Sequence, residues 1–414
     1  MENQLIIRNG VVLICFILLT FFFFIKKQEQ KTNWSLFYSL LWLTFSLPIV
    51  NYLCVKYNLW LFISETDLSI KIPFDLLFIW IIFWGILPFY IAKGKYTLLT
   101  FLVLLWIDIL LMPQLEKFGI LKLNENWIIG EFILLLIVWL PAYLWATYSY
   151  TNKHLNFRAF LQVSTMGLLI LIIIPFIVIS YTSNNFSFEK IRPYLFQLTF
   201  IIVLPSLAAV NDLVKKGKGT PFPYDKTTKL VQTGVYAYCR NPIQWSFTFL
   251  FIPLSMYYES YVLLSGTIIS IAYTLGVSNP QEYLDMENRF ENKWRTYKKS
   301  VPNWRFLWKP QNIPIGTLYF KKGCNQCEQV KKWFENRNAC NLQIKYEYEF
   351  HENKLLQATY TDNNNNHYKS IIAIANGLEH INLFWASLSW FMRLPIIHHV
   401  LQAIIDSMDC NKQD

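Results

Sequence analysis

The sequence predicts an all-helical polytopic membrane bundle of about nine helices, followed by a carboxyl-terminal α/β domain. Of the 414 residues, 54% are hydrophobic and only 15% are charged, against roughly 25% charged residues in a typical soluble domain. Long apolar runs fill the first 280 residues and are missing from the remainder. This composition excludes a disordered chain and argues against an ordinary soluble globule. The 37 Lys and Arg and 27 Asp and Glu residues are too many for a wholly buried bundle, so the charge must be concentrated in particular parts of the chain.

A helix needs about 20 mostly apolar residues to cross the hydrocarbon core of a bilayer. Nine segments meet or approach this length, and the eighth is short for a full span. They are 5–25, 35–55, 73–92, 96–113, 128–147, 159–181, 194–213, 243–258 and 260–277. The sequence therefore predicts that the membrane part ends near residue 280.

The distribution of Lys and Arg between the loops predicts the orientation of the bundle. Lys26 and Lys27 follow the first segment, whereas a cleavable signal carries its charges in front, so we expect a retained helix. With the amino terminus outside, the cytoplasmic loops hold thirteen Lys and Arg residues and the outside loops hold seven. We therefore expect a multi-pass protein of a bacterial inner membrane with a cytoplasmic carboxyl-terminal domain. The net charge of +10 then faces anionic lipid, and nucleic acid is not an expected partner.

Three acidic residues, Asp75, Asp108 and Glu131, interrupt the apolar segments of the amino-terminal half. Acidic side chains in a bilayer are costly and usually face a cavity or a partner. One interpretation is a path for a proton or substrate. The other is that they lie near the membrane surface or bond to a neighbouring helix, and the sequence leaves both open.

The loop between the seventh and eighth apolar segments has residues that define a particular shape. Glycine and prolines within 219–223 prevent a regular helix. Gly234 predicts a tight turn before an aromatic pair, and Arg240 with Asn241 offers donors for a carboxylate or phosphate. Pro242 suits the first turn of the next helix.

An acidic stretch follows the ninth apolar segment. Glu282 and Glu287 are expected at the cytoplasmic end of that helix or just beyond it. The basic loop and the acidic stretch thus flank the two ends of one helical hairpin. This arrangement predicts a pocket for a zwitterionic cofactor near the membrane surface.

Together the two stretches resemble the isoprenylcysteine carboxyl methyltransferase and phospholipid methyltransferase superfamily. That family shows Leu-Val-x-x-Gly-x-Tyr and Arg-His/Asn-Pro, a helical hairpin, and then Glu-Glu-x-x-Leu and Phe-Gly-x-x-Tyr-x-x-Tyr-x-x-x-Val-Pro. The match covers about residues 195–305. The resemblance implies a membrane methyltransferase that uses S-adenosyl-L-methionine and acts on an isoprenoid, a prenyl-cysteine or a phospholipid.

The resemblance also implies which residues form the site. Arg240 and Glu282 are the implied catalytic residues. A carboxylate acceptor needs no base, whereas a hydroxyl or amine acceptor would need one such as Glu282. The implied cofactor-binding residues are Lys229, Val231, Gly234, Tyr236, Arg240, Asn241, Pro242, Glu282 and Glu287.

The chain departs from the family pattern at four positions. Lys229 stands where many members have His, and Gln244 where a Tyr usually follows the Pro. Tyr283 replaces the second Glu of the pair, for which Glu287 one turn later is the candidate substitute. Glu291 replaces the Gly after the conserved Phe of the family pattern.

The carboxyl-terminal region predicts a small α/β domain with a cysteine pair. Strands are expected at 316–320 and 342–350, a helix at 328–336, a loop at 362–367 and mostly helix at 369–408. A strand followed by Cys-x-x-Cys at a helix start is typical of a thioredoxin-like redox domain. Cys324 would be the attacking thiol and Cys327 the resolving one. A zinc half-site and an inert cysteine pair are the alternatives, although no second Cys-x-x-Cys accompanies this one.

Residues 314–408 are similar to the DCC family of predicted thiol-disulfide oxidoreductases, notably at 378–382 and 390–395. The resemblance implies a thiol partner for the cysteine pair. The expected domains are 1–190, an amino-terminal transmembrane module, 191–312, the methyltransferase core, and 313–414, a thioredoxin-like domain. Two other functions remain open at this stage, namely a membrane-anchored thiol-disulfide oxidoreductase and a non-catalytic membrane scaffold.

Overall fold

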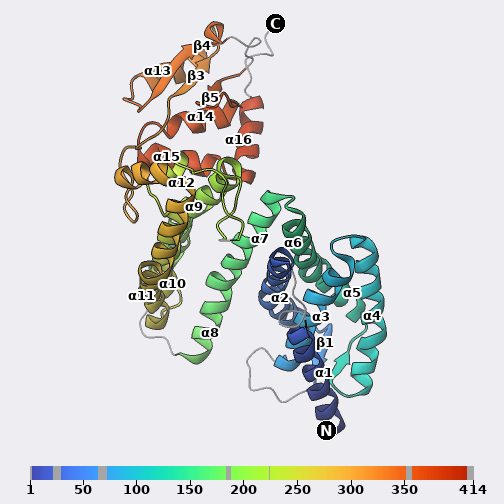
Figure 1. The fold of residues 1–414 in the computed structure, drawn as a ribbon. Helices are drawn as coiled ribbons and strands as arrows, with labels where there is room; N and C mark the ends of the chain where they lie inside the picture. Colours follow the sequence, from blue (N-terminus) through green and yellow to red (C-terminus); the bar gives the residue numbers. More distant parts are fainter. Residues whose placement is uncertain are drawn as a thin grey trace. The chain divides into compact units, whose positions relative to one another are not determined.

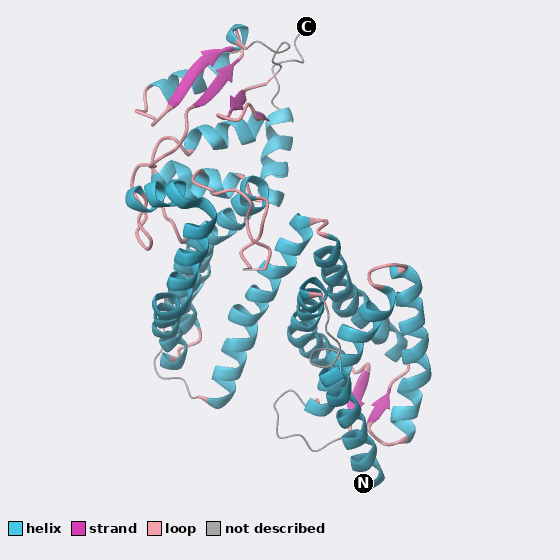
Figure 2. Cartoon of the chain, in the orientation of Figure 1, coloured by secondary structure: helices cyan, strands magenta, loops and turns pink. Residues whose placement is uncertain are grey.

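The computed structural model describes residues 2–21, 29–63, 72–182, 188–222, 224–350 and 357–407. The chain is mostly helical and forms two compact units (Figure 1, Figure 2). The first unit comprises residues 1–181 with 222–224, and the second comprises 182–221 with 225–414. Seven helices among the described residues are long and apolar enough to span a membrane. The prediction of a helical, multi-pass membrane protein is confirmed at this level.

The first unit is a helical bundle whose connections include one small antiparallel β-pair, β1 (Trp60–Phe62) with β2 (Leu121–Leu123). Each of the helix pairs α5–α6 and α7–α8 is one long helix interrupted by a single π-helical turn. The helices are α1 (Glu2–Thr20), α2 (Gln30–Lys56), α3 (Phe74–Ala92), α4 (Thr97–Lys117), α5 (Trp127–Leu134), α6 (Leu140–Thr151), α7 (Leu155–Leu168) and α8 (Ile174–Tyr181).

The three acidic residues of this unit have different surroundings. Asp75 forms an ion pair with Arg8 of α1, with 2.5 Å between the closest nitrogen and oxygen. Asp108 and Glu131 are both buried, on the faces of α4 and α5 that pack against the bundle. Glu131 therefore lies inside the bundle rather than at a hydrated helix end.

The membrane part of the second unit consists of α9 (Arg192–Asp212), α10 (Pro242–Tyr257) and α11 (Tyr261–Tyr273). Helix α10 packs against both α9 and α11. A π-helical turn then continues α11 directly into α12 (Asn279–Ser300). The 16-residue α10 and the short apolar part of α1 fall below the length of a full span, which is why seven helices qualify and not nine.

The carboxyl-terminal part contains a four-stranded sheet in the order β4-β3-β5-β6. Strand β3 pairs in parallel with β4 and antiparallel with β5, which pairs antiparallel with β6. The elements are β3 (Gly316–Phe320), α13 (Asn325–Glu335), β4 (Leu342–Tyr346), β5 (Thr359–Thr361), β6 (His367–Lys369), α14 (Ser370–Leu378), α15 (Leu383–Met392) and α16 (Pro395–Ser407).

The sequence predicted the first two strands of this sheet and the helices, but it placed the end of the second strand too late and missed the other two strands. Strand β4 ends at Tyr346 rather than at residue 350, because Glu347–Glu349 forms a 3₁₀ turn capped by Tyr346 and Glu349. Two three-residue strands, β5 and β6, flank the polar loop at 362–366. Such short strands carry too few residues for an alternating pattern to be recognised.

A group of four charged residues, three of them with buried side chains and Lys216 half-buried, joins the carboxyl-terminal helices to the end of α9. The Asp212 carboxylate lies 3.0 Å from the Lys216 ammonium and 3.3 Å from the Arg393 guanidinium. Arg393 also pairs with Glu379, whose backbone carbonyl accepts a 2.7 Å hydrogen bond from the Tyr238 hydroxyl. We call Asp212, Lys216, Glu379 and Arg393 the ionic network. The described parts of 191–312 and 313–414 lie in one compact unit, and the boundary between them stays a sequence prediction.

Candidate functional site

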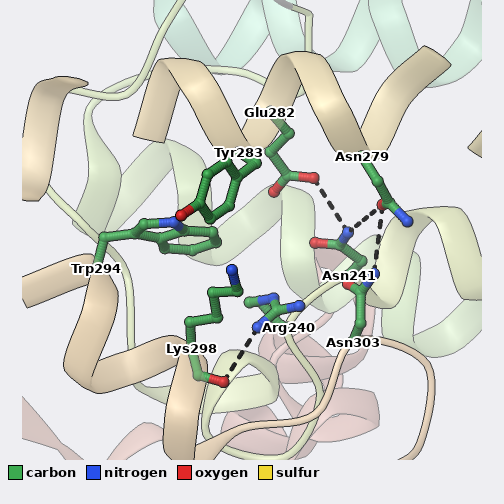
Figure 3. Close-up of a pocket in the computed structure, with 8 residues that line it drawn as sticks. All are labelled: Arg240, Asn241, Asn279, Glu282, Tyr283, Trp294, Lys298 and Asn303. Carbon is green, nitrogen blue, oxygen red and sulfur yellow. Dashed lines mark hydrogen bonds between the residues drawn. The ribbon is translucent and has the colours of Figure 1, made fainter. Parts of the chain in front are cut away.

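A cavity of about 200 Å³ lies where α10 begins, against α12 and the chain that follows it (Figure 3). Asn241 caps α10, and Pro242 occupies the first turn as predicted. The polar half of α12 supplies most of the remaining wall. The lining residues are Arg240, Asn241, Asn279, Glu282, Tyr283, Trp294, Lys298 and Asn303.

Asn241 organises one side of this pocket. Its side-chain amide donates to Glu282 Oε2 at 3.0 Å and lies 3.4 Å from Asn279 Oδ1. The Asn303 amide also donates to Asn279 Oδ1, at 3.3 Å. The bond from Asn241 holds the Glu282 carboxylate so that it faces the pocket (Figure 3). Asn279 in turn links the amides of Asn241 and Asn303.

Two cations and two aromatic rings form the other side. The Arg240 guanidinium lies 5.4 Å from the centre of the Trp294 ring, and Arg240 Nη1 donates to the Lys298 carbonyl at 3.2 Å. The Lys298 ammonium lies 3.8 Å from the centre of the Tyr283 ring. Within the described part of the chain, neither cation has a carboxylate within 4.0 Å. The pocket thus presents a carboxylate and two cations, and each cation lies over an aromatic ring.

Hydrogen bonds connect the loop behind the pocket to α12 and to the chain that follows it. The Arg240 backbone N–H donates to the Pro302 carbonyl at 2.9 Å, and the Tyr297 hydroxyl donates to the Tyr236 carbonyl at 2.8 Å. Burial raises the pKa of Tyr236 well above its usual value, so this phenol stays neutral. Burial also raises the pKa of the Cys239 thiol to about 12, which makes it unreactive at neutral pH.

Gly234 begins the 3₁₀ turn that leads into this loop, and its φ of +70° confirms the predicted tight turn. A Cβ atom at this position would lie 1.9 Å from Asp212 Oδ2. The same carboxylate oxygen accepts a 3.3 Å hydrogen bond from the Val235 N–H. The glycine is therefore required by both the backbone conformation and the close approach of Asp212.

The structure brings three of the predicted site residues, Arg240, Asn241 and Glu282, into one pocket. Four other predicted residues are buried and do not line the pocket. They are Val231, Gly234, Tyr236 and Pro242. Two predicted cofactor ligands do not line this pocket. The Lys229 side chain is exposed, and Glu287 pairs with Arg295.

The sequence analysis missed Asn279, Trp294, Lys298 and Asn303 as lining residues, and it noted Tyr283 only as a departure from the family pattern. A usable signal was present, because Asn279, Glu282 and Tyr283 share one helix face, as do Trp294 and Lys298. The two faces meet because α12 kinks at Glu291, where φ is 43° and ψ is −118°. This is the position at which the family pattern has Gly. The backbone here has a conformation that favours glycine although the residue is Glu.

The cysteine pair lies at the start of α13, directly after β3. Cys324 is the amino-terminal cap of the helix, and the Cys327 N–H donates to its sulfur at 3.5 Å. Both side chains are partly exposed. A helix amino terminus favours the thiolate form of a cysteine placed there.

Known proteins give no match to this chain, whether the comparison uses family models, curated sequences or solved structures. The methyltransferase and DCC resemblances therefore stay predictions from the sequence. Among the described residues, no three His, Cys, Asp or Glu side chains are grouped so that they could hold a metal ion.

Proposed function

We propose that the protein is an integral membrane methyltransferase that uses S-adenosyl-L-methionine and modifies a lipophilic acceptor at the membrane surface. The pocket of Arg240, Glu282 and Lys298 is the observation that carries this proposal. It places one carboxylate opposite two cations at the end of a hairpin whose second helix can span the membrane. That charge pattern is complementary to the amino-acid end of the cofactor.

The residues present fit this group. Arg240 and Lys298 would bind its carboxylate, since both cations lack a carboxylate partner among the described residues. Glu282 would bind its ammonium, and the Trp294 or Tyr283 face would lie against its sulfonium, as aromatic faces do with cations. The cavity of about 200 Å³ is below the roughly 300 Å³ of a small ligand pocket. The cavity is therefore too small for the whole cofactor. It would hold the amino-acid end, and the nucleoside would extend out of the opening of the cavity.

When bound, the cofactor would supply an electrophilic methyl group. The chain's own contribution is to orient that group and to exclude water, which accounts for much of the rate in such reactions. Arg240 and Lys298 fix one end of the ligand, and Glu282 is held by the 3.0 Å bond from Asn241. For a hydroxyl or amine acceptor, Glu282 would also accept the released proton.

The test is cofactor binding to the purified protein, measured by equilibrium dialysis. We expect Arg240→Ala to weaken binding by about tenfold or more, since a charge-assisted hydrogen bond contributes about 1.5–3 kcal/mol. Arg305→Ala is the matched control, because Arg305 is exposed and does not line the pocket. Equal affinity in both variants would contradict the proposed site. Label transfer from methyl-labelled cofactor to membrane lipid or protein then tests the reaction and identifies the acceptor.

A second candidate activity is thiol-disulfide exchange by the carboxyl-terminal domain. A central strand leading to Cys-x-x-Cys at a helix start, within a four-stranded mixed sheet, supports a thioredoxin-like fold. In the exchange, the Cys324 thiolate would attack a partner disulfide, and Cys327 would then displace the partner as a dithiol. The two electrons pass to the partner while the pair becomes a disulfide.

The exchange is tested by following reduction of a disulfide-containing peptide by the reduced protein. Cys324→Ser abolishes the reaction if the pair is active, and Cys340→Ser, which alters another partly exposed cysteine, leaves it unchanged. Failure of both this assay and the binding assay would favour the scaffold alternative.

A further inference from the structure

Helix α15 has an apolar face that the rest of the described chain leaves open at Phe384 and Leu388 and partly covers at Phe391, which packs against the core. Phe384, Leu388 and Phe391 follow one another at helical spacing and form a stripe along one side. Phe384 is 59% exposed and Leu388 is 39% exposed. The opposite side of the helix, with Ala386, Ser389 and Trp390, is buried. We call Phe384, Leu388 and Phe391 the apolar stripe.

The apolar stripe is adjacent to a membrane-spanning helix. Helix α15 packs against α9, and Ala386 and Trp390 share a core cluster with Leu204. Phe391 meets the ring of Phe200 edge-on, with 6.0 Å between the ring centres. Phe200 precedes Asp212 by about 18 Å of helix, at 1.5 Å per residue. Of the stripe, Phe391 therefore contacts the apolar part of α9, while Phe384 and Leu388 stay exposed.

The stripe also continues an apolar surface that is already present on α9. Phe196, Phe200 and Ile201 of α9 are exposed, and the partly buried Phe391, in ring contact with Phe200, joins this surface to Leu388 and Phe384 on α15. Figure 1 shows α15 running crosswise to α10 and α11, within the same unit.

An aromatic residue marks the amino-terminal end of α15. The Leu383 N–H donates to the Trp308 carbonyl at 2.8 Å, and the Trp308 side chain is 61% exposed. Trp is enriched where membrane and water meet. Arg393, just beyond the other end of α15, pairs with Asp212 at the end of α9.

We propose that α15 is an in-plane membrane helix that inserts Phe384 and Leu388 into the boundary between lipid headgroups and acyl chains. The occupant of the stripe is the phospholipid bilayer. The carboxyl-terminal domain is then held on the membrane surface by its own helix in addition to the ionic network. An apolar face beside charged and aromatic flanking residues is the pattern expected of such helices. This inference is independent of the proposed methyl transfer.

The test uses the full-length protein in lipid nanodiscs that contain phosphatidylcholine with a photoreactive diazirine in its acyl chain. After irradiation and proteolysis, mass spectrometry locates the lipid adducts. We expect adducts on Phe384 and Leu388, in addition to those on the spanning helices. Tyr348 is the internal control, because it is 68% exposed in the 3₁₀ turn after β4 and does not belong to α15. We expect at least fivefold fewer adducts there.

A variant separates lipid contact from nonspecific labelling. Phe384→Ser with Leu388→Ser should lower the yield of adducts on α15 at least fivefold, while labelling of Phe196 on α9 stays constant and reports intact folding. Adducts confined to the spanning helices would overturn the proposal. Adducts on Tyr348 equal to those on α15, or cross-links of α15 to a second copy of the chain, would overturn it as well.

Discussion

Two groups of charged residues in the second unit differ in how their charges are matched. In the ionic network, Asp212 and Arg393 are buried and each contacts two charges of opposite sign. In the pocket, Arg240 and Lys298 rest on aromatic rings and face Glu282 across a cavity. The charges of the ionic network are paired with one another and stabilise the fold. The charges of the pocket border a cavity, so they remain available to bind a ligand.

The physical reason lies in the cost of burying charge. An ion taken out of water is tolerated when partners surround it, and removal of one partner leaves the other charge uncompensated. An exposed or half-buried cation keeps part of its hydration, so the fold does not depend on its pairing. The comparison therefore makes opposite predictions for stability and for binding.

The largest expected effect comes from Arg393→Ala, which leaves Asp212 and Glu379 without their shared cation. We expect the free energy of unfolding to fall by about 3–5 kcal/mol. Arg240→Ala should change it by less than about 1 kcal/mol, since only one hydrogen bond and one cation–π contact are lost. Chemical unfolding in detergent micelles, followed by tryptophan fluorescence, measures both variants. Equal destabilisation of the two would remove the distinction between network and pocket.

The second effect is a loss of stability in acid, which comes from His380 beside the network. His380 is buried, accepts a hydrogen bond from Tyr360 at 2.8 Å and donates one to the Cys340 carbonyl at 2.7 Å. Burial lowers its pKa to about 4, whereas in the unfolded chain it titrates near 6.5. Between these values the unfolded state binds the proton and the folded state does not. Stability should therefore fall by about 3 kcal/mol as the pH drops from 6.5 to 4.

The control for this pH dependence is His380→Gln. Other groups, Glu379 included, titrate in both proteins, so the difference between the two stability curves isolates the histidine. We expect the difference to be constant above pH 7 and to change through the window from pH 6.5 to 4. A difference that is flat through this window would show that His380 is protonated in the folded state.

The third effect concerns Gly234, which links the network to the loop of the pocket. Gly234→Ala places a Cβ where Asp212 Oδ2 now lies, and it keeps a φ of +70° that side chains disfavour. We expect a loss of about 2 kcal/mol in stability, together with weaker ligand binding. Gly276→Ala is the control, since a Cβ there meets nothing within 4 Å. That variant should be neutral or more stable.

The smallest effect tests the strain at the wall of the pocket. Glu291→Gly relieves the positive φ of 43° and should raise stability by about 1 kcal/mol. Asn288→Gly, in a regular turn of the same helix, should lower it by about 0.5–1 kcal/mol. Destabilisation by Glu291→Gly would mean that the kink is absent in the folded protein.

The sequence predicted what depends on local pattern. Long apolar runs identified the membrane helices, and the Gly234 turn and the Pro242 helix start follow from backbone chemistry. The motif also located Arg240, Asn241 and Glu282, which share one pocket.

Features that depend on distant residues were not accessible from the sequence. Arg393 and Asp212 are 181 residues apart, and no spacing rule connects them. The second aromatic wall of the pocket depends on the kink at Glu291, which turns Trp294 toward Tyr283. A Glu at that position gives no local signal for a bend.

The helix formed by α11 and the first part of α12 fixes the distance between Tyr261 and the pocket. From Tyr261 it runs to the kink at Glu291. From Tyr261 to Glu282 it rises by about 32 Å, which equals the thickness of the hydrocarbon core of a bilayer, about 30 Å. With Tyr261 at one surface, the helix delivers Glu282 to the other. The distance from Tyr261 to the pocket is then set by a count of residues, and inserting or deleting one turn would shift it by about 5 Å.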